Sequence, residues 1–374
     1  SMKPMDKLDT EIKETTSNLP LLQLEKAPLP EPGIILGWLR QMLLIREFEV
    51  RTMQAYQNRL IGGFCHVYIG QEAIAVGSIA AVNPDDPIVL AYRCHGHALA
   101  RGMDPKFCMA EMFGRIGGCA KGKGGSMHMF DAPHHLYGGH GIVGAQTPLG
   151  TGLAFATKYE DEILQDGKSS HVTLCYLGDG AINQGAFYEA MNLAGLFDLP
   201  VIFVLENNRY SMGTSIERGT TMANDLHTKS EAHGINHAIV DGKDVLSLYQ
   251  SFKSIAGWCR ENSRPFFVEA QTYRYKGHSM SDPRKYRTRD EEAQEETQDC
   301  IERLEKHLCE EHDLTQDGIK QLSRQVKTQV REAVEWANKS PEPPMEELYK
   351  DVYVDHWGPF TGTSKPLMLQ GEDE

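Results

Sequence analysis

The sequence has little of what marks several large classes of protein. Its eight cysteines include no pair separated by two residues, which favours reduced thiols over a disulfide framework or a zinc site. No apolar run approaches the roughly 20 residues of a membrane span, and no signal-peptide pattern opens the chain. Positive charge is in deficit, with 38 Lys and Arg against 52 Asp and Glu. We therefore expect neither nucleic acid nor a membrane among its partners.

Length and hydrophobic content are sufficient for a large core. The chain has 374 residues, of which 40% are hydrophobic. Composition divides it into a polar, proline-punctuated arm (1–33), an α/β domain (34–290), and a helical extension with a tail (291–374). We expect the arm to wrap around a neighbour or to be disordered. No internal repeat is visible.

The most informative segment runs from residue 171 to residue 208. Short apolar, β-branched runs at 171–177 and 201–205 suit buried parallel strands, and 184–197 has helical length and periodicity. The segment is therefore predicted to form a βαβ unit. Its right-handed crossover would place the carboxyl ends of both strands on one edge of the sheet. Asp179 and Asn208, which follow the two strands, should then face one spot.

The residue types at these two strand ends fit a hard cation and a diphosphate. Mg²⁺ prefers oxygen ligands and commonly takes only one or two from side chains. Gly178 and Gly180 allow close approach of the backbone, and a helix beginning near Asn183 would direct free N–H groups at an anion. A lone GDG is as often an ordinary turn, but GDG with the paired asparagines is far more specific. It resembles the thiamine-diphosphate motif of transketolases, pyruvate decarboxylases and 2-oxo-acid dehydrogenases.

A second glycine pattern, GHGIVG at 139–144, matches the dinucleotide-binding GxGxxG, with Glu160 and Asp161 near the distance of a ribose-binding acid. The residues before it, MFDAPHHLYG, show no apolar strand pattern, and a long helical region precedes them. We therefore favour a close-approach glycine loop that leads into a helix starting near Thr147 over a nicotinamide site.

Six segments in order (62–73, 91–102, 122–130, 138–152, 206–214 and 273–291) resemble the α-subunits of the decarboxylating component of pyruvate dehydrogenase complexes, over roughly residues 34–350. This resemblance implies a parallel-sheet thiamine-diphosphate-binding α/β fold with helices on both faces. It implies thiamine diphosphate and Mg²⁺ as cofactors. The implied reaction is oxidative decarboxylation of pyruvate with reductive acetylation of a lipoyl group.

The resemblance also implies partners. They are a β-subunit in an α₂β₂ heterotetramer and the lipoyl domain of the dihydrolipoamide acyltransferase component. The residues beyond about 290 are predicted to be helices and tail, so the second α/β domain that such enzymes need must come from another chain. By analogy we expect a bacterial cytoplasmic location, or the mitochondrial matrix if a transit peptide precedes the sequence.

By the same resemblance, Mg²⁺ is held by the side chains of Asp179 and Asn208 and by the main-chain carbonyl of Tyr210. Four further positions correspond to residues that bind the diphosphate: Tyr92, Arg93, Gly180 and Ala181. An arginine suits this role because its guanidinium presents a fixed fork of donors.

The remaining implied site residues surround the organic part of the cofactor and the substrate. Gly141 and Val143 correspond to residues whose backbone meets the aminopyrimidine ring, and Met212 to the apolar wedge that keeps the cofactor bent. His66 and His278 match the two active-site histidines of the family. His66 would lie near the substrate and His278 beside the diphosphate.

Some alternatives stay open. A branched-chain 2-oxo acid or acetoin dehydrogenase α-subunit would share the motifs, although GFCH at 63–66 and HSMSDP at 278–283 favour pyruvate. A non-catalytic homologue is disfavoured because the cation and histidine positions are kept together. Ser279 and Ser215 match two of the three regulatory serines of mammalian relatives, whereas residues 283–286 replace the segment that holds the third.

Overall fold

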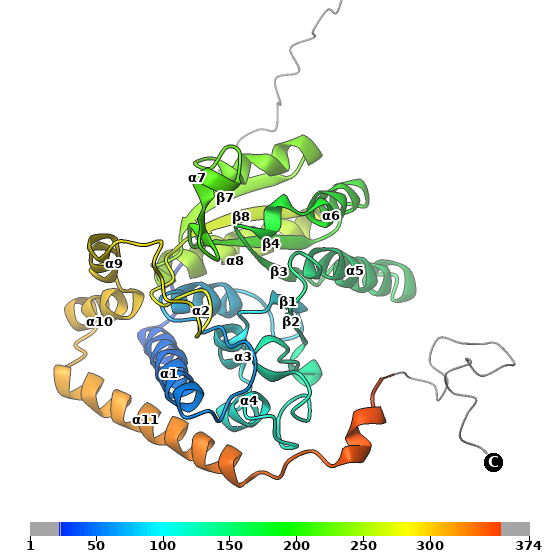
Figure 1. The fold of residues 1–374 in the computed structure, drawn as a ribbon. Coiled ribbons are helices and arrows are strands. Elements are labelled where there is room, and N and C mark those ends of the chain that lie inside the picture. The colour runs from blue at the N-terminus through cyan, green and yellow to red at the C-terminus, as the bar shows by residue number, and fades with distance from the viewer. Residues whose placement is uncertain (1–21, 23, 353–374) are drawn as a thin grey trace, which may run out of the picture.

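The computed structural model describes residues 22 and 24–352, so most of the predicted arm and part of the predicted tail lie outside it. Within that range six parallel strands form one sheet in the order β2-β1-β3-β4-β8-β7 (Figure 1). These strands are β1 Ile88–Ala91, β2 Leu136–His140, β3 Thr173–Gly178, β4 Val201–Asn207, β7 Asn236–Asp241 and β8 Phe266–Gln271. A small antiparallel ribbon, β5 Tyr210–Ser211 and β6 Thr214–Ser215, follows β4.

Helices cover both faces of the sheet. The α-helices are α1 Pro32–Gln57, α2 Glu72–Ala80, α3 His95–Arg101, α4 Pro105–Met112, α5 Gln146–Tyr159, α6 Gly185–Leu196, α7 Ile216–Gly219, α8 Val245–Asn262, α9 Arg289–Glu296, α10 Cys300–Glu311 and α11 Gln316–Lys339. A π-helical turn, Glu160–Leu164, continues α5. The predicted βαβ unit is β3, α6 and β4, and the predicted fold class is confirmed. None of the helices in the described range is long and apolar enough to cross a membrane.

Successive side chains of the central strands point to opposite faces of the sheet and so enter two separate cores. In β3, Leu174 and Tyr176 enter a core shared with α1, α2 and α8, whereas Cys175 and Leu177 enter a second core shared with α5 and α6. Burial on both faces explains why these strands are almost uniformly apolar in the sequence. Helices α10 and α11 add Ile301 and Val330, among others, to the first core. The division of the chain at residues 33 and 290 stays a prediction.

One expectation from the sequence is wrong. The residues before the GxGxxG pattern were expected not to form a strand, yet β2 lies there, parallel to β1 at the edge of the sheet. An edge strand needs little apolar character, and β2 has the sequence LYGGH. Gly139 is required by packing, because a Cβ there would lie 2.4 Å from the Met127 carbonyl oxygen. The strand leads through the glycine loop into α5, which begins at Gln146, one residue before the predicted start.

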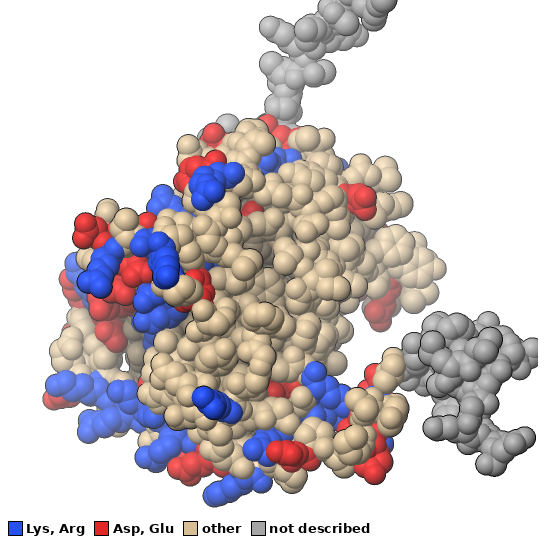
Figure 2. Space-filling view, viewed as in Figure 1, with Lys and Arg blue, Asp and Glu red and all other residues tan. Residues whose placement is uncertain are grey.

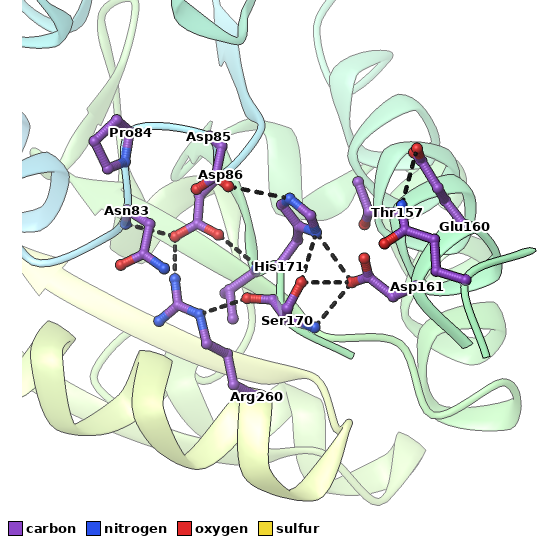
Figure 3. Close-up of polar contacts among 12 residues, drawn as sticks. Asn83, Pro84, Asp85, Asp86, Thr157, Glu160, Asp161, Ser170, His171 and Arg260 are labelled. Carbon is purple, nitrogen blue, oxygen red and sulfur yellow. Dashed lines mark hydrogen bonds and ion pairs between the residues drawn. The ribbon is translucent and has the colours of Figure 1, made fainter. Parts of the chain in front are cut away.

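A polar cluster ties together the amino ends of β1 and β3, remote from their carboxyl ends (Figure 3). The buried carboxylate of Asp86 accepts the N–H groups of Asn83 and Val172 and forms an ion pair with Arg260. The imidazole of His171 lies between Asp161, at 3.0 Å, and Asp85, at 3.4 Å. Partial burial disfavours the imidazolium, but the hydrogen bond and charge of Asp161, aided by Asp85, outweigh it and raise the pKa of His171.

Candidate active site

A cavity of about 970 Å³ opens at the carboxyl ends of β1, β3 and β4, where open parallel sheets bind ligands. Each of these strands runs directly into residues that line it. All twelve residues singled out from the sequence lie on its wall: His66, Tyr92, Arg93, Gly141, Val143, Asp179, Gly180, Ala181, Asn208, Tyr210, Met212 and His278. The sequence therefore predicted which residues meet, while the role of each stays a prediction.

Asp179 and Asn208 follow the ends of the neighbouring strands β3 and β4, and both line the cavity at the place called the corner below. Asp179 is buried, and its Oδ1 accepts the N–H of Gly180 at 3.1 Å. Its Oδ2 is buried and has no hydrogen-bond partner among the described residues. Burial raises the pKa of this carboxyl to about 6. A buried, unpaired carboxylate oxygen is costly unless a positive group meets it, and a hard cation would do so.

The turn after β4 also lines the cavity, and an arginine holds two of its main-chain carbonyls. Arg274, a fully buried arginine that also lines the cavity, donates to the Tyr210 carbonyl at 3.1 Å and to the Met212 carbonyl at 3.3 Å. It thereby holds Met212 in a left-handed conformation with φ 53°. The Tyr210 carbonyl keeps one lone pair for a cation, since Arg274 occupies only the other.

Sequence reasoning missed Arg274. It lies in a stretch rich in basic residues, so no local signal separates it from its neighbours. Burial, together with the charges of Arg93 and Arg287, lowers its pKa to about 10. Its guanidinium therefore stays positively charged at neutral pH and contributes cationic character to the cavity wall.

Three aromatic rings of the cavity wall lie close to one another. The ring centroids of His66 and Tyr92 are 4.7 Å apart, those of His66 and His278 5.1 Å, and those of Tyr92 and His278 5.7 Å. Burial, followed by the charge of Arg93, lowers the pKa of His66 to about 2 and that of His278 to about 3. Both imidazoles are thus neutral at physiological pH. The Nδ1 atom of each is buried without a partner among the described residues.

Arg93 connects the loops that carry the two histidines. Its guanidinium donates to the Val67 carbonyl and to the His278 carbonyl, both at 2.8 Å. These bonds use part of the fork of donors that the sequence assigned to the diphosphate, and the other N–H groups stay available. Asp282 fixes the loop that carries His278 by accepting the His278 N–H at 2.6 Å.

A second glycine-rich segment, residues 120–125, is called the 120–125 loop. It is anchored by one side chain that the sequence did not single out. The carboxylate of Glu111, fully buried at the end of α4, accepts four backbone N–H groups, from Ala120, Gly122, Gly124 and Gly125. The next residue, Ser126, accepts the N–H of His66 on its hydroxyl oxygen at 3.2 Å. The position of His66 therefore depends on this loop.

Comparison with known proteins fits this geometry. A model of the family described as "Dehydrogenase E1 component" matches residues 40–346. The chain belongs to the dehydrogenase E1 component family. The resemblance found from the motifs is thereby confirmed.

Individual members of the dehydrogenase E1 component family are similar over most of the chain. A Rickettsia typhi protein named "Pyruvate dehydrogenase E1 component subunit alpha" is 46% identical over 315 residues, which cover 84% of this chain and 94% of that protein. A protein of the same name from Rhizobium meliloti is 47% identical over 316 residues, 84% of this chain and 88% of that protein. The mitochondrial counterpart from Sminthopsis macroura is 42% identical over 339 residues, 88% and 90% of the two chains.

Proposed function

We propose that this chain is the α-subunit of a pyruvate dehydrogenase. Together with a β-subunit it would use thiamine diphosphate and Mg²⁺ to decarboxylate pyruvate and to acetylate a lipoyl group on an acyltransferase partner. The observation that carries the proposal is the meeting of all twelve expected residues in one cavity, with an unpaired carboxylate oxygen of Asp179 at the expected cation position. The names of the relatives agree with it.

The residues that line the cavity fit thiamine diphosphate and Mg²⁺. Asp179, Asn208 and the Tyr210 carbonyl would hold the cation with two side-chain oxygens and one main-chain oxygen, a donor set typical of Mg²⁺. The backbone at Gly180 and Ala181 and the guanidinium of Arg93 would bind the diphosphate. When bound, thiamine diphosphate supplies the nucleophilic carbon that attacks the 2-oxo carbonyl.

The two histidines would act as neutral imidazoles. A neutral imidazole carries a donor on one ring nitrogen and an acceptor on the other, so it can donate a hydrogen bond to an oxygen of the substrate or accept one from a hydroxyl group there. His66 and His278 each keep Nδ1 free of protein partners within the described range. Their depressed pKa values also avoid two positive charges 5.1 Å apart, measured between the ring centroids.

The rim of the cavity supports a β-subunit as partner. Phe64, Ile142 and Met212 expose 68%, 78% and 65% of their surface, although all three belong to the site or adjoin it. Burial of such apolar groups favours association. In Figure 2 charged side chains gather over α9, α10 and α11, and the surface between α2 and α5 carries few of them. A partner that covers the rim would also exclude water from the cavity.

Activity assays with and without the β-subunit test the proposal. The purified chain alone should not decarboxylate pyruvate, and adding the β-subunit should restore thiamine-diphosphate-dependent and Mg²⁺-dependent turnover. Branched-chain 2-oxo acids and acetoin in the same assay decide the substrate, and we expect pyruvate to give the highest kcat/KM. Robust turnover by the chain alone would refute the need for a partner. A preference for either other substrate would refute the pyruvate assignment.

A further inference from the structure

Gln71 is a buried polar residue of the cavity wall that neither the motifs nor the family resemblance assigned. It is 1% exposed and precedes α2. The backbone fixes its position, because Gly70 before it has φ +100° and packs so closely that a Cβ would lie 2.5 Å from the Tyr273 carbonyl oxygen. The Tyr275 N–H also donates to the Ile69 carbonyl at 3.2 Å. The turn at Gly70 therefore places the Gln71 side chain beside the end of β4.

The hydrogen bonds around Asn208 determine which way the Gln71 amide points. The main-chain N–H of Tyr210 can only donate, and it donates to Asn208 Oδ1 at 3.3 Å. The Asn208 NH₂ group therefore faces the other way and donates to Gln71 Oε1 at 3.0 Å. Gln71 must present its carbonyl oxygen to this donor, so its own NH₂ group points elsewhere.

That NH₂ group has no protein partner. Gln71 Nε2 is buried and makes no hydrogen bond within the described part of the chain. A buried donor left unpaired costs free energy, and such groups in native proteins usually have a partner. Gln71 shares the cavity wall with Asp179 and Asn208, at the corner where the proposed function places a cation and its diphosphate.

We propose that Gln71 is a further ligand-binding residue of this site, with its amide N–H donating to an anionic oxygen of the bound diphosphate while its carbonyl keeps Asn208 oriented. The inference rests on the proposed function. It gives Gln71 two separable tasks, since the carbonyl acts on a protein neighbour and the NH₂ group acts on the ligand.

Two substitutions separate these tasks. Gln71→Met keeps the shape of the side chain and removes both the donor and the acceptor. Gln71→Glu keeps an acceptor for Asn208 but presents a carboxylate to the diphosphate in place of a donor. Ser78→Ala is the matched control, because Ser78 is buried on the adjoining helix α2 and bonds to Tyr176, away from the corner. Thermal unfolding without ligand shows whether each variant complex is folded.

Calorimetric titration of the assembled α–β complex with thiamine diphosphate at saturating Mg²⁺ is the main measurement. We expect Gln71→Met to weaken affinity by about tenfold to a hundredfold, the range for a hydrogen bond to a charged group. Gln71→Glu should weaken it at least as much. Ser78→Ala should stay within about twofold of wild type. Binding of Mn²⁺ alone, followed by electron paramagnetic resonance, should be retained in Gln71→Glu because Asn208 stays oriented.

Other outcomes are decisive against the inference. Wild-type affinity for thiamine diphosphate in Gln71→Met, or in Gln71→Glu, would show that the NH₂ group does not meet the diphosphate. A loss of Mn²⁺ binding in both variants that accounts for the whole loss of cofactor affinity would reduce Gln71 to a residue that only orients Asn208. A wild-type complex that binds no thiamine diphosphate would instead overturn the proposed function, and the inference with it.

Discussion

Replacing Asp179 by asparagine should stabilise the chain without cofactor and abolish its response to cofactor. The carboxyl group is buried, and burial raises its pKa from 3.8 to about 6. The folded protein therefore holds this proton between pH 3.8 and 6 when the unfolded chain has lost it. The free energy of unfolding of wild type should fall as pH rises through this window, and the full loss is present above pH 6.

The size of this loss in the free energy of unfolding follows from the rise in the pKa of Asp179. A rise from 3.8 to about 6 corresponds to about 3 kcal/mol at 1.36 kcal/mol per pKa unit. The amide introduced by Asp179→Asn carries no charge, so this substitution should remove most of the penalty at pH 8 and about half as much at pH 5. With saturating Mg²⁺ and thiamine diphosphate, wild type should become more stable than Asp179→Asn, because binding to the folded state stabilises wild type alone.

Thermal unfolding of the α–β complex at pH 5 and pH 8, with and without the two cofactors, measures all of these differences. Asp161→Asn serves as the contrasting variant, because hydrogen bonds from Ser170 and His171 outweigh burial and lower the pKa of Asp161. It should lose stability at pH 8 and keep its response to cofactor. A destabilised cofactor-free Asp179→Asn variant, or one that cofactor stabilises as it does wild type, would contradict the assignment of Asp179 to the cation.

Substitutions at three further residues test other parts of the structure. His66→Ala should lower turnover by about 10²–10⁴-fold, as for a positioned acid or base, while calorimetry finds cofactor affinity nearly intact; wild-type turnover would remove His66 from the reaction. Ser279→Glu should lower turnover or apparent cofactor affinity by about one to two orders of magnitude in steady-state kinetics, because Ser279 lines the cavity next to His278, and Ser279→Ala should be mild. Equal kinetics of the two Ser279 variants would place the residue away from bound anions. His171→Phe should destabilise the protein at pH 6 by about 0.5–1 kcal/mol, and by less as pH rises through the raised pKa of His171, since only the imidazolium pairs with its two carboxylates; a pH-independent loss in thermal unfolding would argue against those ion pairs.

The sequence predicted those parts of the fold and site whose cause is local. The apolar runs of β3 and β4 are buried on both faces, so their pattern is strong, and the residues that follow such strands must meet at one edge. Strand β2 was missed because an edge strand with the sequence LYGGH has almost no periodic pattern of its own. Its identity depends on pairing with β1, which the sequence does not reveal.

The supporting residues of the site were missed for a related reason. Gln71 and Arg274 act through hydrogen bonds to partners that are distant in sequence: Gln71 and Asn208 are 137 positions apart, and Arg274 and Tyr210 are 64. Glu111 bonds to the main chain of a segment that begins 9 positions further on, where no side chain marks the contact. Nothing in the immediate neighbourhood of such residues separates them from surface residues of the same type. Motif matching finds residues at fixed local spacings more readily than residues whose role depends on a hydrogen-bond partner elsewhere in the fold.

The anchoring of the 120–125 loop by Glu111 determines which residues of this region can vary among related proteins. The carboxylate of Glu111 accepts main-chain N–H groups of residues 120–125, so these four hydrogen bonds do not involve the side chains of Lys121 and Lys123. The amines of Lys121 and Lys123 pair with Glu347 and Asp351. Substitution of these lysines would leave the hydrogen bonds to Glu111 in place. Loss of Glu111 itself would leave four amides unpaired at once. We therefore expect natural variation at the two lysines and very little at the glutamate.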